Sequence, residues 1–195
     1  IDEFVQIASK SHLVILHLHG GKKSLACFDD LVSELEAAGV PIHAQATASE
    51  QDTELFKRST VDKEDYWSIT RYLNYGGKEN FKGLLLYLAH RFGGFDCAVP
   101  EPERPIWDGI YHPDFDHVPT LDEYLEQRHA GGRPTVGIWF YNGLWQSGNT
   151  AFVDRLIAEI EGQGANVIPV FMYSLKDVEL GTHGAEWVME NYFMR

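Results

Sequence analysis

The sequence of an apolar run, a helical segment and a second apolar run occurs twice along this chain. In the first instance, the nearly continuous apolar run Leu13–His19 ends at Gly20-Gly21. Such a run is typical of a strand that is buried on both faces. Apolar residues then recur at helical spacing up to Gly39, a residue type that suits the left-handed position at the end of a helix. Val40–His43 predicts the next strand, which completes a βαβ unit.

The second instance occupies the carboxyl-terminal part of the chain. Thr135–Tyr141 predicts a strand, Asn149–Glu161 an amphipathic helix and Asn166–Met172 another strand. Ala185–Phe193 has the pattern of a further helix. Two such units predict an α/β protein with Rossmann-like or flavodoxin-like three-layer units, a mostly parallel sheet and partial domains.

Helices and then prolines separate the two βαβ patterns. Lys63–Tyr75 predicts a helix that Asp62 caps, and a second helix follows Gly76-Gly77. Five prolines between residues 95 and 119 disfavour regular structure there. Leu121–His129 predicts a short helix. The expected organisation is an α/β unit over 1–94, a proline-rich connector over 95–132 and the start of a truncated second α/β unit over 133–195.

Charge and cysteine content exclude several classes of partner. The 29 acidic and 16 basic residues give a formal charge of −13. Such a surface repels phosphate backbones and anionic lipids, so we expect neither nucleic acid nor membrane as a partner. The two cysteines, Cys27 and Cys97, are too few for a disulfide framework or a thiolate metal site. A reduced, cytoplasmic setting is therefore expected.

Two histidines lie near the carboxyl end of the first predicted strand. His17 and His19 are two residues apart, so their imidazoles are expected on the same face of the strand. Ligands of open α/β sheets bind beyond the carboxyl ends of strands, where two imidazoles could share a metal ion or a carboxylate. The alternative is one buried histidine bonded to a carbonyl group and one half-exposed histidine.

A pair of glycines precedes the helix that begins near residue 77. Gly76 and Gly77 allow close approach to the backbone, and the amides at the start of a helix suit an anion such as a ligand carboxylate. Gly76, Gly77 and Asn80 are therefore candidate ligand-binding residues. Glu79 could be a metal ligand. The alternative is an ordinary helix start, where its negative charge in the first turn interacts favourably with the helix macrodipole.

His112 belongs to a loop that is rich in potential metal ligands. Two imidazoles and two carboxylates occur within six residues, at His112, Asp114, Asp116 and His117. These groups suit a borderline divalent ion such as Co²⁺, and the fixed φ of Pro113 would help to orient His112. The alternative is an ordinary polar connector, because the spacing matches no defined metal motif.

The loop that follows the predicted strand Thr135–Tyr141 contains aromatic residues and leads into the start of a helix. Tyr141 and Trp145 could stack on a flat ring of a ligand, while the amides near Asn149 could meet a carboxylate. Asn149 or Thr150 could equally serve only as the helix cap. The chain contains no phosphate-binding loop motif, so ATP is expected to bind elsewhere.

Five segments, in their order and spacing, resemble the cobaltochelatase large-subunit (CobN) family, which is related to the large subunit of magnesium chelatase. The segments are Gly109–Asp114, Gly132–Tyr141, Gly148–Asp154, Val167–Phe171 and Ser174–Asp177. Members of this family are much longer, so the chain is expected to be a fragment without activity of its own. The chain has Asn142 and Leu144 where the family typically has a basic residue and a histidine.

The resemblance implies a function for the full-length protein. It would bind the corrinoid precursor hydrogenobyrinic acid a,c-diamide and Co²⁺ as substrates, while AAA+ partner subunits use ATP to drive insertion during cobalamin synthesis. His112 and Glu79 are then candidate catalytic residues, and His112, His17 and His19 candidate metal ligands. The alternatives are a magnesium chelatase H-type subunit that acts on protoporphyrin IX, or a non-catalytic binding or scaffolding module.

Overall fold

The structure, a computed structural model, describes residues 2–47, 53–173, 176–178 and 180–194. Contacts divide the chain into two compact units, Ile1–Arg104 and Pro105–Arg195, and each is considered by itself. Ser174 and Leu175 of the sequence motif Ser174–Asp177 lie outside the described residues. The α/β class predicted from the sequence is confirmed, with parallel strand pairing in both units.

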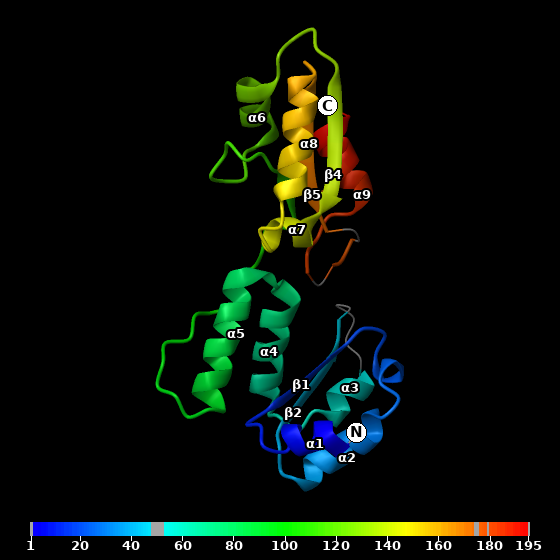
Figure 1. Cartoon of the computed structure of the whole chain (residues 1–195), viewed down its shortest axis with the longest axis vertical. Helices are drawn as coiled ribbons and strands as arrows, with labels where there is room; N and C mark the ends of the chain where they lie inside the picture. The colour runs from blue at the N-terminus through cyan, green and yellow to red at the C-terminus, as the bar shows by residue number, and fades with distance from the viewer. Residues whose placement is uncertain (1, 48–52, 174–175, 179, 195) are drawn as a thin grey trace. The chain divides into compact units, whose positions relative to one another are not determined.

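The first unit contains two parallel strands, β1 (Val14–Leu18) and β2 (Ile42–Ala46), with Val14 opposite Ile42 (Figure 1). The helical elements around them are α1 (Asp2–Ala8), the 3₁₀ turn η1 (Lys22–Ser24), α2 (Phe28–Ala37), α3 (Thr53–Arg58), α4 (Lys63–Tyr75) and α5 (Gly77–Arg91). Alternation along the strands sends side chains to both faces of the sheet, so both faces can be covered by helices.

Each face of the β1–β2 pair has its own apolar cluster. Leu16 and Ile42 lie in one cluster, together with Leu35 of α2. Ile15, on the other face, packs against a second cluster that contains Ile69 of α4 and Leu84 of α5. The first unit is therefore three-layered, with helices on both sides of a short parallel sheet.

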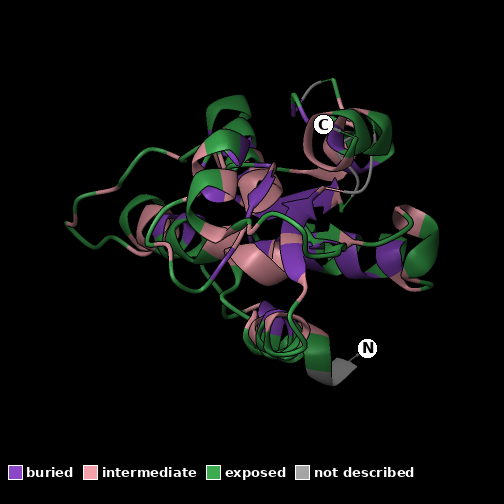
Figure 2. Ribbon diagram, turned by 90° about the horizontal axis from the view of Figure 1, so that it is seen from above, coloured by how far each residue is buried: buried purple, intermediate pink, exposed green. Residues whose placement is uncertain are grey.

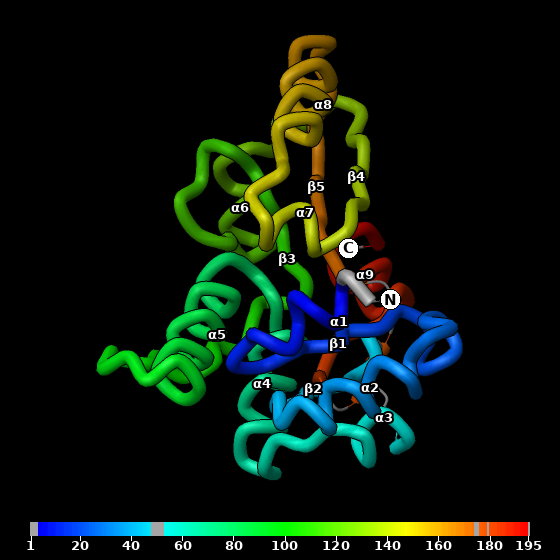
Figure 3. Tube along the Cα trace, turned by 60° about the horizontal axis from the view of Figure 1, so that its bottom comes forward, coloured from blue at the N-terminus to red at the C-terminus, as the bar shows by residue number. Residues whose placement is uncertain are grey.

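The second unit contains a mixed sheet with the strand order β3-β5-β4. Its strands are β3 (Asp108–Ile110), β4 (Thr135–Tyr141) and β5 (Asn166–Met172), and its helical elements are α6 (Leu121–Arg128), α7 (Asn142–Gln146), α8 (Ala151–Gly162), α9 (Ala185–Val188) and the π-helical turn η2 (Met189–Phe193). Strand β4 is parallel to β5 and β3 is antiparallel to it, and the trace in Figure 3 shows β4 and β5 side by side.

Helices cover both faces of this sheet as well. Phe140 and Phe171 pack with Val153 and Ile157 of α8 on one face. On the other face, a second cluster contains Ile110 of β3, Val170 of β5, Tyr124 of α6 and Val188 of α9. Figure 2 shows buried residues concentrated on the strands and on the inward sides of the helices. The predicted three-layer arrangement is therefore present in this unit.

The stretch predicted to lack regular structure contributes to the second unit. β3 lies between Pro105 and Pro113, and the prolines leave enough residues for a three-residue antiparallel strand. Gly109 is required there, because a Cβ at this position would lie 2.5 Å from Cγ1 of Val118 and 3.1 Å from the Phe171 ring. Strand β3 and helix α6 both come from the range predicted as a connector, which is thus part of a folded layer from Pro105 onward.

Gly83 lies where α5 packs closely against Tyr72 of α4 and against Pro100 in the segment that follows α5. A Cβ at Gly83 would lie 2.7 Å from Cε1 of Tyr72 and 3.4 Å from Cγ of Pro100, and the Tyr72 hydroxyl donates to the Pro100 carbonyl. We predict that Gly83→Ala lowers the free energy of unfolding by about 1–3 kcal/mol through overpacking. Urea denaturation followed by circular dichroism measures this change.

Gly162→Ala is the matched control, because a Cβ on Gly162 of α8 meets no atom within 4 Å. It should leave stability unchanged or raise it by up to about 1 kcal/mol, the gain in helix propensity. If Gly83→Ala is as stable as the parent chain, the described packing of α4, α5 and Pro100 is wrong.

Candidate functional site

The imidazole of His112 is buried in the second unit, with 2% of its surface exposed. Its Nδ1 atom accepts the backbone N–H of Asp114 at 3.2 Å, so the proton of the neutral ring resides on Nε2. Nε2 lies 3.4 Å from Oε1 of Glu161. The ring therefore faces a carboxylate of α8 on one side and its own loop on the other.

Arg128 of α6 completes this network. Its guanidinium contacts Oδ2 of Asp114 at 2.8 Å and both carboxylate oxygens of Glu161 at 2.8 and 2.7 Å. Burial, and next the positive charge of Arg128, lower the pKa of His112. These bonds join the loop to α6 and α8, and they hold His112 as a neutral, buried ring.

His112 lies near the amino-terminal end of the parallel strands. The antiparallel strand β3 ends at Ile110 opposite Val170, and the N–H of Tyr111 donates to the Pro169 carbonyl at 2.9 Å. Continuing in this direction, His112 passes toward the start of β5. Ligands of open α/β sheets bind at the opposite, carboxyl-terminal end of the strands.

Three aromatic residues, which we call the aromatic edge, gather at that carboxyl-terminal end: Trp107, Tyr141 and Tyr173. Tyr141 ends β4 and is 52% exposed. Its ring centroid lies 6.3 Å from that of Tyr173, which lies 5.3 Å from Trp107. Burial, and next the neighbouring Tyr141, raise the pKa of Tyr173. The structure thus brings Tyr141, a predicted ligand-binding residue, together with Tyr173, which follows the end of β5, and with Trp107, which sequence patterns did not single out.

Asn142 fixes the backbone beneath the aromatic edge. Its buried amide donates to the carbonyl groups of Ile106 and Trp107 at 2.8 and 3.0 Å. The Trp107 carbonyl also accepts the N–H of Tyr173 at 3.0 Å, and the Trp107 indole N–H donates to Leu180 at 3.1 Å. These bonds tie the start of α7 to the segment before β3 and to the end of β5.

Asp108 and His183 form a pair at the same end of the sheet. Oδ2 of Asp108 lies 2.8 Å from Nδ1 of His183. Because an ionised carboxylate only accepts, Nδ1 donates and Nε2 of the neutral ring is left as an acceptor. The His183 ring stacks on Trp187 with a centroid distance of 3.8 Å and is 48% exposed by its side chain.

This Asp108–His183 pair was missed by sequence reasoning. The two residues are 75 positions apart, and neither belongs to a recognisable motif. The position of Asp108, at the start of a strand that pairs with the carboxyl end of β5, becomes apparent only from the antiparallel register of β3. The Tyr192 hydroxyl also approaches Asp108, at 3.5 Å, and burial raises the pKa of Tyr192 to about 12.

The loop between β4 and α8 contains the short helix α7 and ends at Thr150, one of the two predicted cap residues. The Asn149 side chain is exposed, and the backbone N–H of Asn149 donates to the Leu144 carbonyl at 2.8 Å. Thr150 is the N-cap residue of α8 without a capping side-chain bond to the described residues, and its hydroxyl instead meets that of Tyr111 at 2.9 Å. Trp145 stacks on Phe171 at 4.2 Å, so one face of its ring is already covered.

In the first unit, Gly76 and Gly77 have φ of 61° and 77° and begin α5. Asn80 is buried and makes a reciprocal pair of bonds with the backbone of Glu103, donating at 2.8 Å and accepting at 2.9 Å. Glu79 is exposed and lies 4.0 Å from Lys82. Asn80 therefore holds a neighbouring segment, whereas Glu79 faces solvent.

The two histidines of the first predicted strand have different surroundings. His17 lies within β1, opposite Gln45, and loss of water around its ring lowers its pKa. His19 lies beyond the end of β1, with Nδ1 2.9 Å from the Thr47 hydroxyl. Their roles as metal ligands stay predictions.

His43 of β2 is a buried histidine that the sequence analysis did not select. It is fully buried, and Nε2 lies 2.8 Å from Oε1 of Gln45, whose amide donates to Asn74 at 3.1 Å. The ring packs 4.7 Å from Tyr66. Nδ1 has no hydrogen-bond partner among the described residues. Burial lowers the pKa of His43 to about 4.

The chain matches a known protein family over most of its length. The model of the CobN/Magnesium Chelatase family matches residues 70–195, well over half of the chain. The chain belongs to this family. The resemblance inferred from the five sequence segments is thereby confirmed.

Relatives of this CobN/magnesium chelatase family chain are much longer. An uncharacterized protein of Methanocaldococcus jannaschii is 34% identical over 198 residues, covering 100% of this chain and 16% of the relative. The aerobic cobaltochelatase subunit CobN of Sinorhizobium sp is 32% identical over 195 residues, covering 93% and 15%. The chain spans about one sixth of the length of these curated relatives.

A solved structure has the same fold. The catalytic subunit of cobaltochelatase from Mycobacterium tuberculosis matches with a TM-score of 0.59 and 22% identity, covering 92% of this chain and 15% of that chain. At this identity the likeness concerns the fold alone.

Two further properties of this family member concern metal ions and membranes. Within the part of the chain that the structure describes, no group of three His, Cys, Asp or Glu side chains is arranged to hold a metal ion. Any metal bound at His112, His17 or His183 would therefore need ligands from elsewhere. Across the described helices, none has the length and apolar character needed to cross a bilayer.

The depressed pKa of His43 predicts a pH dependence of stability. Between the reference value of about 6.5 and the folded value of about 4, the unfolded chain binds a proton that the folded chain does not. Above pH 6.5 the His43 imidazole is neutral in both the folded and the unfolded chain, so it adds no pH dependence to the stability. The free energy of unfolding should fall by about 3 kcal/mol as the pH drops through this window.

NMR titration of the imidazole resonances tests this directly. His43 should titrate near pH 4, whereas His117, whose pKa is raised by hydrogen bonds to Asp116 and Glu123, should titrate above 6.5. A His43 midpoint at or above 6.5 would contradict the buried position of its ring.

Proposed function

We propose that the chain is a segment of the large, tetrapyrrole-binding subunit of a cobaltochelatase-type metal chelatase. The match to the CobN/Magnesium Chelatase family over residues 70–195 is the observation that supports this most strongly. The similarity to an aerobic cobaltochelatase subunit across nearly the whole chain favours the cobalt branch.

In this proposal, the full-length protein holds hydrogenobyrinic acid a,c-diamide and Co²⁺ as substrates. AAA+ partner subunits hydrolyse ATP, which agrees with the lack of a phosphate-loop motif in this sequence. A magnesium chelatase H-type subunit acting on protoporphyrin IX is the second candidate, because the family model covers both branches.

The aromatic edge is the proposed contact surface for the ring. A flat macrocycle stacks favourably on exposed aromatic rings, and Tyr141 has half of its surface free for such a contact. The edge also lies at the carboxyl-terminal end of β4 and β5, where ligands of this fold class bind. Tyr141 thus remains a proposed ligand-binding residue, with Tyr173 added to it, while the buried Trp107 packs against Tyr173 from within.

Metal insertion displaces the protons carried by the ring nitrogens, so it needs a base. His183 is suited to this role because Asp108 orients its ring and leaves Nε2 as an exposed acceptor. His112 and Glu79 remain candidate catalytic residues, but His112 is enclosed by Asp114, Glu161 and Arg128. The geometry therefore favours His183 over His112 as the proton acceptor.

A non-catalytic binding or scaffolding module is the alternative from a different class. It is favoured by the internal use of Asn80, Asn142 and His112, three polar residues that bind the chain's own backbone. In that case the ring would be held by the rest of the full-length protein.

Absorbance titration of the chain with the free-base corrinoid, and separately with protoporphyrin IX, tests ring binding. Tyr141→Ala should weaken binding about two- to tenfold, the contribution of one aromatic contact. Phe152→Ala is the matched control, since Phe152 is also half-exposed but lies on α8. Equal affinity of both variants and the parent chain would contradict the proposed edge, and a lack of any spectral shift with either ring would favour the scaffold alternative.

A further inference from the structure

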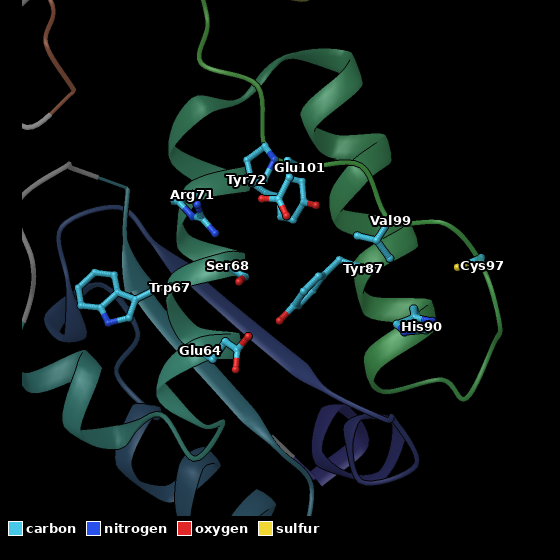
Figure 4. A pocket seen from close by; sticks show the side chains of 11 residues that line it. Glu64, Trp67, Ser68, Arg71, Tyr72, Tyr87, His90, Cys97, Val99 and Glu101 are labelled. Carbon is cyan, nitrogen blue, oxygen red and sulfur yellow. The ribbon is translucent and has the colours of Figure 1, made fainter.

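A pocket of about 430 Å³ lies within the first unit, between α4, α5 and residues 97–102 (Figure 4). No residue of this pocket belongs to the candidate site described above. In Figure 4, Glu64, Ser68 and Arg71 lie on α4, Tyr87 and His90 on α5, and Glu101 on the segment that follows α5. The pocket is thus enclosed by two helices and one extended segment.

The extended wall of the pocket is fixed to the two helices at several points. The His90 imidazole Nδ1 lies 3.0 Å from the Phe95 carbonyl, and the Cys97 thiol donates to Leu86 at 3.5 Å. The Tyr72 hydroxyl donates to Pro100, and Asn80 holds Glu103 through its two backbone bonds. A wall held in this way is formed before a ligand arrives, which lowers the entropy cost of binding.

The inner surface of the pocket contains groups that already have partners. The Tyr87 hydroxyl donates to Oδ1 of Asp65 at 2.6 Å, and Nε of Arg91 donates to the same oxygen at 2.8 Å. Burial, and next the bond to Asp65, raise the pKa of Tyr87 to about 12. Tyr87 is therefore a neutral ring at physiological pH and offers an aromatic surface to a ligand.

The charged groups that face the pocket come from two of its walls, α4 and the segment that follows α5. Glu64 and Arg71 are seven positions apart on α4, so they lie on the same side of this helix, two turns apart. Glu101 lies on the opposing wall. Over the described ranges, Glu64, Arg71 and Glu101 have neither an ion pair nor a side-chain hydrogen bond.

The balance of these charges determines what the pocket can hold. With histidine neutral, two carboxylates face one guanidinium, which leaves one negative charge in excess. Aromatic surface from Tyr87 adds the negative face that attracts a cation. The formal charge of −13 on the whole chain also favours a positive ligand over a negative one.

We propose that this pocket binds a small organic monocation, a primary ammonium or guanidinium group with an apolar body. Glu64 binds the charged group, while the apolar body lies against Tyr87. Free amines and the side chains of lysine or arginine share this chemistry. The inference is independent of the proposed chelatase function, because it rests only on residues of the first unit.

Titration at pH 8 of the ¹⁵N-labelled chain, followed through the backbone amide resonances of Ser68 and Tyr87, tests the proposal. The probes are phenethylammonium, the neutral 2-phenylethanol and the anionic 3-phenylpropionate, which share one apolar body and differ in charge. Phenethylammonium should bind most tightly and 3-phenylpropionate least.

A further probe, Nα-acetyl-lysine N-methylamide, mimics a lysine in a protein and separates the two possible sources of the cation. Similar binding of this probe indicates a protein side chain, and weaker binding indicates a free amine.

Variants of the charged residues make the test specific. Glu64→Gln should weaken the binding of phenethylammonium up to about fivefold, the value of one partly exposed charge pair. Arg71→Gln should leave that affinity unchanged or increase it, because a nearby positive charge is removed. Glu36→Gln, an exposed position on α2, is the matched control and should have no effect.

The proposal is overturned if 3-phenylpropionate binds more tightly than phenethylammonium, or if Arg71→Gln abolishes cation binding. It is also overturned if the three probes bind equally, since the pocket would then recognise only the apolar body.

Discussion

The parallel pairing of β4 with β5 is the constraint on which the arrangement of the second unit depends. Seven successive pairs, from Thr135–Asn166 to Tyr141–Met172, align the ends of the two strands. Phe140 and Phe171 are neighbours in this register, and both bury their rings under α8. The alignment fixes where Tyr141 and Tyr173 emerge, and it brings Asp108 to the same end through the antiparallel strand β3.

Sequence patterns predicted the βαβ elements because burial imposes a period on the apolar residues. Thr135–Tyr141 and Asn166–Met172 have the same bounds in the structure as in the prediction, and α4 likewise covers Lys63–Tyr75. The short elements β3 and α7 escaped prediction, since a three-residue strand and a five-residue helix contain too few residues to show a period.

The candidate site was predictable only where strand ends determine it. Tyr141 was found because it ends a strand, whereas the Asp108–His183 pair depends on residues brought together by the register of β3 and by the fold of the last helices. His112 was selected for its polar neighbours, and in the structure its ring is buried beside one of them, Asp114, and beside Glu161 of α8, while Asp116 and His117 pair with each other. Composition of a loop does not reveal which of its polar groups face each other.

Amide hydrogen exchange with and without the bound ring tests the central claim most directly, because it maps the contact surface without any substitution. The account predicts slower exchange at Asp108 and at Tyr141–Gly143, around the aromatic edge at the carboxyl-terminal end of β4 and β5. Protection confined to the loop around His112, at the other end of the same strands, would contradict it.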